Sequence, residues 1–171
     1  MKVQSGAKLR GKFIAEYYRD GKLIWIDETS NIITNEGLDA ILDIMLHAAT
    51  QITTWYCTLV ETNTTPAANM TYATPIYTES TAYDEVVRPE YVEAASSGQS
   101  ITNSANKAVF TINATKTMYG ASLVGGGTDP TVKGNTAGGG KLLCYAQFST
   151  SRSVIASDVI KLTYKVDAAD D

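Results

Sequence analysis

The chain has 171 residues, which is enough for one domain with a sizeable core, and 44% of them are hydrophobic, which excludes a disordered protein. Only 19% are charged and the formal net charge is −4, which argues against a nucleic-acid-binding surface, because such a surface normally carries a basic patch. No apolar run reaches the roughly 18 residues needed to span a membrane, and no signal peptide is evident. We therefore expect a globular protein made in a cytoplasm, with no nucleic-acid or membrane partner.

One amphipathic helix is predicted near the N-terminus, over about residues 34–49. Its apolar residues recur at helical spacing: Leu38, Ile41, Leu42, Met45 and Leu46. Thr34 or Asn35 can cap its start, and Glu36 suits the positive end of the helix dipole. Since an amphipathic helix must pack its apolar face against another element, we expect this face to be buried, so that a charge at position 42 would be costly.

The rest of the chain favours strands and turns. Residues 12–18 and 23–27 predict a hairpin joined at Asp20-Gly21, a dipeptide that tolerates positive φ. The further predicted strands are residues 54–60, 83–94, 108–113, 118–124, 142–148 and 159–166. Pro89 cannot donate to a ladder, so the strand 83–94 is expected to be an edge, to be bulged or to start after the proline. This pattern predicts a mainly β fold, an antiparallel β-sandwich with one helix.

The domain organisation is expected to be simple. Residues 1–11 are predicted to form an N-terminal arm, residues 12–167 a single β-sandwich domain, and residues 168–171 an acidic tail. Two long loops interrupt the strands, a threonine-rich one over 62–81 and a glycine-bounded one over 125–140. Because loops of this length are usually functional or disordered, we expect them, together with the arm, to carry the contacts with other chains.

Two groups of side chains are candidates for these contacts. One group consists of tyrosines in or beside the first long loop: Tyr72, Tyr77, Tyr83 and Tyr91. Tyrosine is favoured at protein interfaces and can also stack on a sugar; the alternative is that buried rings fix the loop to its own domain. The other group is basic: Lys2, Lys8 and Arg10. These residues suit an acidic partner, or else a solvated edge strand.

The sequence carries no recognisable catalytic or metal-binding motif. His47 is the only histidine, and its place late in the helix suits the helix dipole. Cys57 and Cys144 lack the paired spacing of a zinc site and are expected to be free core thiols, with a disulfide as the alternative. No catalytic, cofactor-binding or metal-binding residue is predicted. The protein is therefore expected not to be an enzyme.

Four carboxylates nevertheless gather around one predicted strand: Asp84, Glu85, Glu90 and Glu93. We expect a solvated face there. A glycosidase-like pair is the alternative, and it would require two of these groups to face each other across a cleft.

Several segments resemble the decoration, or cement, proteins of tailed-bacteriophage capsids. They are the helix-opening TNEGLDAILD, the FTIN strand and the glycine-rich loop before KLLCYAQF, and the resemblance runs from about residue 23 to residue 166. It implies a jelly-roll-like body on the outer surface of a virion, a homo-oligomer (dimer or trimer) that binds the major capsid protein and stabilises the lattice by bridging its subunits. Tail proteins share the pattern, so a tail-associated receptor- or carbohydrate-binding module is the alternative.

Overall fold

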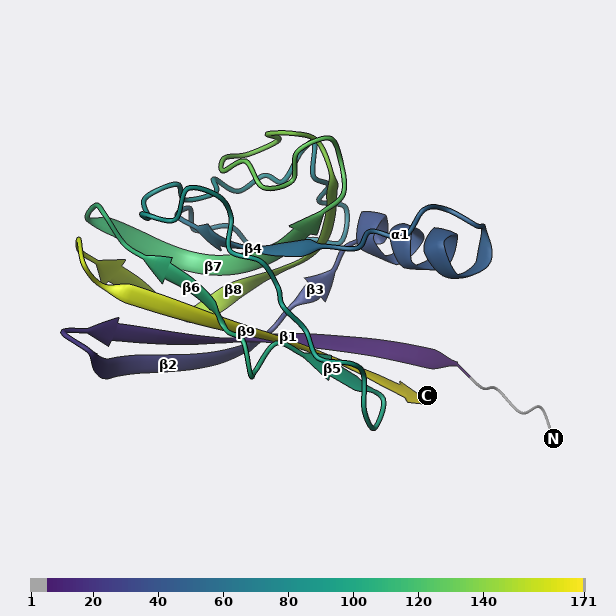
Figure 1. Cartoon of the computed structure of the whole chain (residues 1–171), viewed down its shortest axis with the longest axis horizontal. Coiled ribbons are helices and arrows are strands. Elements are labelled where there is room, and N and C mark those ends of the chain that lie inside the picture. Colours follow the sequence, from purple (N-terminus) through teal and green to yellow (C-terminus); the bar gives the residue numbers. More distant parts are fainter. Residues whose placement is uncertain (1–5, 171) are drawn as a thin grey trace.

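The computed structural model of the protein describes residues 6–170, which form two packed antiparallel sheets and one helix (Figure 1). The elements in chain order are β1 (Ala7–Arg19), β2 (Lys22–Ser30), β3 (Ile32–Ile33), α1 (Asn35–Leu46), β4 (Trp55–Val60), β5 (Ser100–Thr102), β6 (Ala108–Thr111), β7 (Lys116–Gly125), β8 (Lys141–Val154) and β9 (Val159–Asp170). The predicted antiparallel β-sandwich with a single helix near the N-terminus is confirmed.

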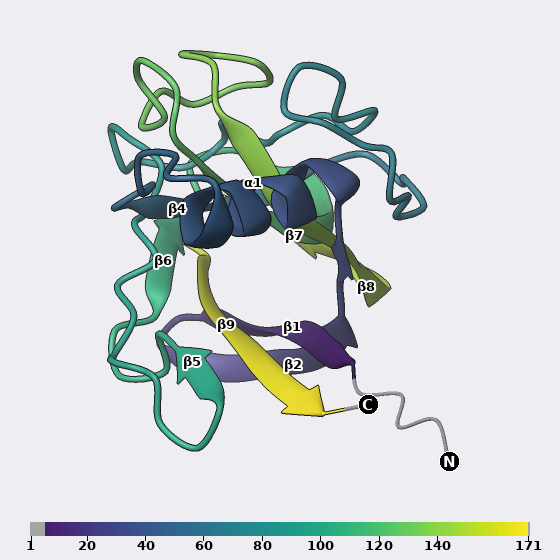
Figure 2. The same ribbon diagram turned by 90° about the vertical axis from the view of Figure 1, so that its right-hand side faces the viewer.

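The first sheet has five strands in the order β2-β1-β9-β5, and β6 also pairs with β9. The second has four strands in the order β3-β8-β7-β4. The predicted β1–β2 hairpin turns at Asp20 and Gly21, which both have positive φ (50° and 71°). Figure 2 shows the two sheets as separate layers, with α1 at the end of the sandwich on the side of the second sheet.

The core lies between the sheets. Along β1, Phe13, Ala15 and Tyr17 are buried because alternate strand residues point to the same face. The ring centroids of Phe13 and Tyr164 lie 4.6 Å apart, and Leu59 and Leu123 of the second sheet belong to the same cluster. Side chains from both sheets thus fill one continuous core.

The terminal strands are longer than predicted. Residues 7–11 belong to β1 and residues 168–170 to β9, and these segments pair with each other from Ala7 opposite Asp170 onward. The prediction of an arm and a tail is therefore wrong for residues 7–11 and 168–170. The two segments form backbone hydrogen bonds with each other, and this pairing is not evident from the sequence of either segment alone. Residues 1–5 and 171 lie outside the described residues.

The connection between β4 and β5 also differs from the prediction. Residues 83–94 do not form a strand. Two isolated bridges, Tyr83 with Ile112 and Tyr56 with Glu90, and single backbone hydrogen bonds such as that from the Ala94 amide to the Thr102 carbonyl tie them to the sheets. Pro89 still accepts a hydrogen bond through its carbonyl from Cys57 but cannot donate one, so pairing does not propagate. β5 was not among the predicted strands, and β8 continues to Val154, beyond the predicted strand 142–148.

The helix begins where the sequence places it but ends at Leu46 instead of about residue 49, and its apolar face is not buried. Thr34 caps α1, accepting a hydrogen bond from the Gly37 amide at 3.0 Å, and His47 follows as the C-cap residue. Gly37 and Ala40 are buried. The large apolar residues of the outer face are exposed: Leu38 (41%), Leu42 (54%), Met45 (73%) and Leu46 (80%). The expectation of a buried face including Leu42 is wrong.

Gly37 explains this orientation. A Cβ atom at Gly37 would lie 2.4 Å from the carbonyl oxygen of Leu143, so the helix backbone rests directly on β8. Only small residues permit such an approach. Ile41 and Ile44 are half-buried, and the larger residues on the opposite side point away from the body.

The two cysteines are free and buried. Cys57 on β4 and Cys144 on β8 both pair with Leu123 of β7, one from each side. Two strand spacings separate their Cα atoms by roughly 9.5 Å, which exceeds the range a disulfide tolerates. The prediction of free core thiols is confirmed.

Candidate interaction surface

The two long loops lie together beyond the outer side of the second sheet, at the top of Figures 1 and 2. We call residues 61–88 and 126–140 the loop layer. The sequence predicts partner-binding tyrosines in these loops. The packing of the loop layer decides which of their side chains are exposed to a partner.

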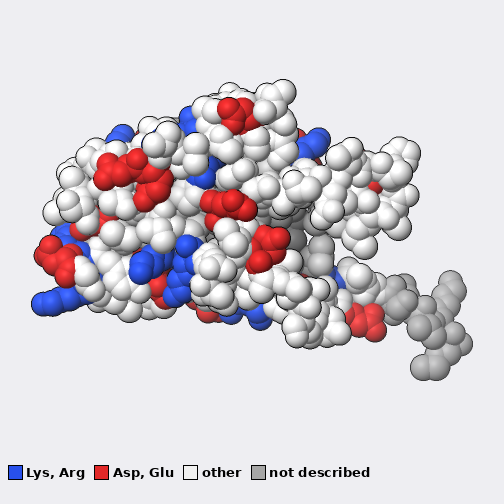
Figure 3. All heavy atoms as spheres, in the orientation of Figure 1, with Lys and Arg blue, Asp and Glu red and all other residues white. Residues whose placement is uncertain are grey.

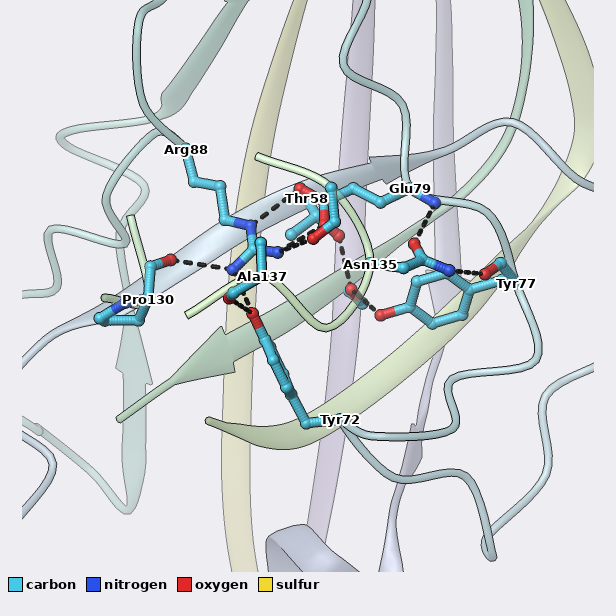
Figure 4. Close-up of polar contacts among 10 residues, drawn as sticks. Thr58, Tyr72, Tyr77, Glu79, Arg88, Pro130, Asn135 and Ala137 are labelled. Atoms are coloured by element: carbon cyan, nitrogen blue, oxygen red, sulfur yellow. Dashed lines mark hydrogen bonds and ion pairs between the residues drawn. The ribbon is translucent and has the colours of Figure 1, made fainter. Parts of the chain in front are cut away.

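Arg88 is the centre of the loop layer (Figure 4). Its side chain is 1% exposed and pairs with Glu79, which is 3% exposed, at 2.6 Å. All five guanidinium N–H groups are used. Nε and Nη2 donate to the Glu79 carboxylate, Nη1 donates to the Tyr72 hydroxyl and the Pro130 carbonyl, and Nη2 also donates to the Gly134 carbonyl, at distances of 2.6–2.9 Å.

This arrangement ties the first loop to the second. Burial disfavours the charged form of Arg88, but the hydrogen bonds and the attraction of Glu79 outweigh it and raise the pKa of Arg88 above its usual value. The loop layer is thus held by a permanent buried ion pair with complete hydrogen bonding, which is the condition under which such pairs are tolerated.

Further contacts anchor the loop layer to the body. Tyr72 donates from its hydroxyl to the carbonyl of Ala137 at 2.5 Å, and its backbone amide donates to Glu36 at the start of α1 at 2.8 Å. The Tyr77 hydroxyl lies 2.8 Å from that of Ser122 on β7. Asn135 bridges the loops, because it accepts from the amide of Glu79 at 2.7 Å and donates to the carbonyl of Tyr77.

The predicted tyrosine anchors are therefore not available at the surface. Tyr72, Tyr77 and Tyr91 are each 5% exposed and Tyr83 is fully buried. The expectation that they contact a partner is wrong, and the alternative, buried rings that fix the loop to its own domain, is what the structure shows.

The basic candidates lie elsewhere. Lys8 and Arg10 are exposed on β1, where they stand opposite Ala169 and Asp167 of β9, and Lys2 lies outside the described residues. The structure does not bring them together with the tyrosines, because β1 belongs to the first sheet and Tyr72 and Tyr77 pack against the second. Lys8 and Arg10 are exposed on a strand, and their contact with a partner stays a prediction.

The carboxylates singled out in the sequence do not converge on a hollow. Glu85 accepts from the amide of Thr111 at 3.0 Å, and Asp84 and Glu90 are exposed. Glu93 lines a cavity of about 230 Å³ at the end of the sandwich, among residues that include no second carboxylate. Within residues 6–170, no group of three or more His, Cys, Asp and Glu side chains is placed to hold a metal ion.

Exposed apolar side chains mark two surfaces that sequence reasoning missed. The outer face of α1 is one. The other is β2, an edge strand on which Leu23, Ile24 and Ile26 are 52–56% exposed. The helical period was the signal for the first surface, but a period shows only that an apolar face exists and not whether it is covered.

Comparison of the chain with models of known protein families gave no match, and neither did comparison with curated protein sequences. In the part of the chain that the structure describes, no helix is long and apolar enough to cross a bilayer.

Proposed function

We propose that this protein is a structural component of a tailed-phage virion that binds the outer surface of the capsid and stabilises the lattice by bridging capsid subunits. The observation that carries the proposal is the gathering of exposed apolar side chains on α1 and β2. Such patches mark contacts with other proteins. The resemblance of the sequence to capsid decoration proteins supplies the kind of partner, the major capsid protein.

A rigid body suits this role. Contacts of Thr34 and Glu36 with the backbone of Leu142 hold the first turn of α1 on β8, so little conformational entropy is lost when this surface binds. Many copies on one lattice add weak contacts through multivalency. The exposed edge of β2 supplies a surface for self-association into a dimer or trimer, in which each copy is placed over an equivalent capsid site.

A tail-associated receptor- or carbohydrate-binding module is the second candidate. The loop layer favours it, because Ile76, Val86 and Val132 remain exposed on a fixed scaffold, 61%, 89% and 41% respectively. Such a module would bind host cells or glycans and would not need to contact the capsid.

A binding experiment distinguishes the two candidates. Purified protein is mixed with capsids assembled without it from the major capsid protein of the same virus, and bound copies and particle survival after heating are measured. We expect saturable binding and greater heat resistance, whereas an unrelated β-sandwich protein of similar charge should give neither. No binding to capsids, combined with binding to host cells or glycans, would replace the proposal with the tail-module function.

A further inference from the structure

We propose that the outer face of α1 is the capsid-contacting surface, and that it binds an apolar groove edged by lysine or arginine side chains on the major capsid protein. This inference rests on the proposed function and names the surface that performs it. We define the α1 face as Leu38, Leu42, Met45 and Leu46 together with Asp39 and Asp43.

The geometry of the helix is the first support. Residues 38, 42 and 46 are spaced four apart and therefore lie along one side of the helix, and Met45 lies beside them. Their exposure rises along the helix from 41% to 80%, because α1 leaves the body as it proceeds. In Figures 1 and 2 the helix stands at the end of the sandwich, beyond the ends of the second-sheet strands, where a partner can reach it.

The firm attachment of the helix is the second support. Thr34 donates from its hydroxyl to the carbonyl of Leu142 at 2.5 Å, and Glu36 accepts from the amide of Leu142 at 2.7 Å. With Gly37 against β8, the first turn is fixed to the second sheet. The apolar row is thus displayed on a rigid support, as a helix that binds in a groove requires.

Charge identifies the kind of groove. Asp39 and Asp43 lie one turn apart and form an acidic row along one flank of the apolar row. Both are exposed, and within residues 6–170 neither is in an ion pair. The lobe that contains α1 is otherwise almost uncharged on the face seen in Figure 3. The complementary surface is apolar with basic residues on one side.

The same charges disfavour a second copy as the occupant. α1 contains no lysine or arginine, so two α1 helices packed together would bring acidic rows to the interface without a cation from either helix. β2, which carries the other exposed apolar row, is the better surface for self-association.

Two pairs of matched variants test the inference on undecorated capsids. Leu42→Asp with Met45→Asp places charges in the apolar row, and its control is Val86→Asp, an 89% exposed position in the loop layer. Asp39→Lys with Asp43→Lys reverses the acidic row, and its control is Asp84→Lys at another exposed carboxylate. Circular dichroism and thermal melting establish that each variant is folded.

We expect each α1 variant to lower the affinity for capsids about tenfold or more, as for a central interface residue, while the controls bind like the unaltered protein. Raising the salt concentration should weaken binding of the unaltered protein, and weaken the Asp39→Lys/Asp43→Lys variant less.

The outcomes separate this inference from the proposed function. If the unaltered protein binds and both α1 variants bind equally well, the α1 face is not the contact, and the proposed function stands. If the α1 variants change only the oligomeric state in solution, a second copy covers the face, which also overturns the inference. If the unaltered protein does not bind capsids at all, the proposed function itself fails.

Discussion

At the scale of single residues, Arg88 connects segments far apart in the sequence. Its partners Glu79, Pro130 and Gly134 belong to both long loops. Replacing Arg88 with methionine would leave the Glu79 carboxylate buried without its cation. We expect a loss of about 3–5 kcal/mol in the free energy of unfolding, measured by urea denaturation.

The same change at Arg10, which is exposed on β1, is the matched control and should cost under about 1 kcal/mol. Limited proteolysis should cut the loop layer faster in the Arg88→Met variant. Equal stability of the two variants would contradict the role assigned to Arg88.

Gly37 gives a prediction with an unusual sign. In an exposed helix, replacing glycine with alanine stabilises by about 1 kcal/mol. Here the added methyl group would meet the backbone of Leu143, so we expect Gly37→Ala to destabilise by about 1–3 kcal/mol. Leu38→Ala, one residue later and exposed, should change stability little. Thermal melting measures both, and a stabilised Gly37→Ala variant would show that α1 does not rest on β8.

Asp158 predicts a dependence of stability on acid. Its carboxylate accepts hydrogen bonds from Arg19 at 2.9 Å and from the Tyr17 hydroxyl at 2.8 Å, and the Arg19 contact lowers its pKa despite burial. A lowered folded-state pKa contributes stability that is present above the unfolded pKa, about 3.9, and is lost as the pH falls through the folded value.

The Asp158→Asn variant isolates this contribution. We expect it to be less stable than the unaltered protein at pH 7, and the difference between the two should shrink as the pH is lowered below about 4. Unfolding free energies measured at several pH values test this. A difference that stays constant down to the lowest pH would mean that the ionisation of Asp158 does not contribute.

At the scale of elements, β2 is an edge strand of the first sheet. Its second half contacts β8, because Thr29 donates to the Gln147 carbonyl and Asp27 accepts from the Ser149 amide, so the exposed part of this edge is its first half. Within the described residues β2 pairs with β1 only, and Ile24 and Ile26 are each 56% exposed. Lysine at a sheet edge opposes pairing with another chain. We therefore expect Ile24→Lys with Ile26→Lys to shift a homo-oligomer to the monomer without unfolding it, as measured by sedimentation.

The control for this experiment is Ile155→Lys, a 44% exposed position between β8 and β9. It should leave the oligomeric state unchanged. If the β2 variant keeps the oligomeric state of the unaltered protein, self-association uses a different surface.

The elements that the sequence predicts well are those with a strong local signal. The Asp20-Gly21 turn needs positive φ, and Thr34 begins the helix with a side chain that caps it. These signals depend on neighbouring residues, so no knowledge of the fold is needed to interpret them.

The elements that failed depend on distant partners. The pattern at 83–94 resembles a strand, but Tyr83 and Tyr91 are buried in the core and Arg88 pairs with Glu79 in the loop layer, so these residues do not form a ladder. The orientation of α1 depends on Gly37 meeting β8 more than 100 residues away in the chain, which a hydrophobic period does not reveal. For the same reason the tyrosines near the loop could not be assigned to the surface or to the interior from their spacing.

At the scale of the whole molecule, the reactivity of the two cysteine thiols is a measure of global unfolding. Both are fully buried beside the central strand β7, and burial raises the pKa of Cys144 to about 12 and that of Cys57 further above its usual value. The reactive thiolate is therefore scarce in the folded protein.

We expect both thiols to resist a thiol reagent under native conditions and to react together, at the rate set by global unfolding. The reaction is followed by absorbance or mass spectrometry, with urea-unfolded protein as the fully reactive reference. Rapid modification of one cysteine in the folded protein would show that the sandwich opens locally at that strand.

The pairing of β1 with β9 has a mechanical consequence. Because Ala7 stands opposite Asp170 in an antiparallel ladder, a force that pulls these two residues apart loads the backbone hydrogen bonds one after another, beginning at that end. The hydrogen bonds between the two strands would break in sequence from that end, instead of all breaking together under shear. We therefore expect the domain to unfold at a low force when it is pulled from these two residues, even though its core is tightly packed.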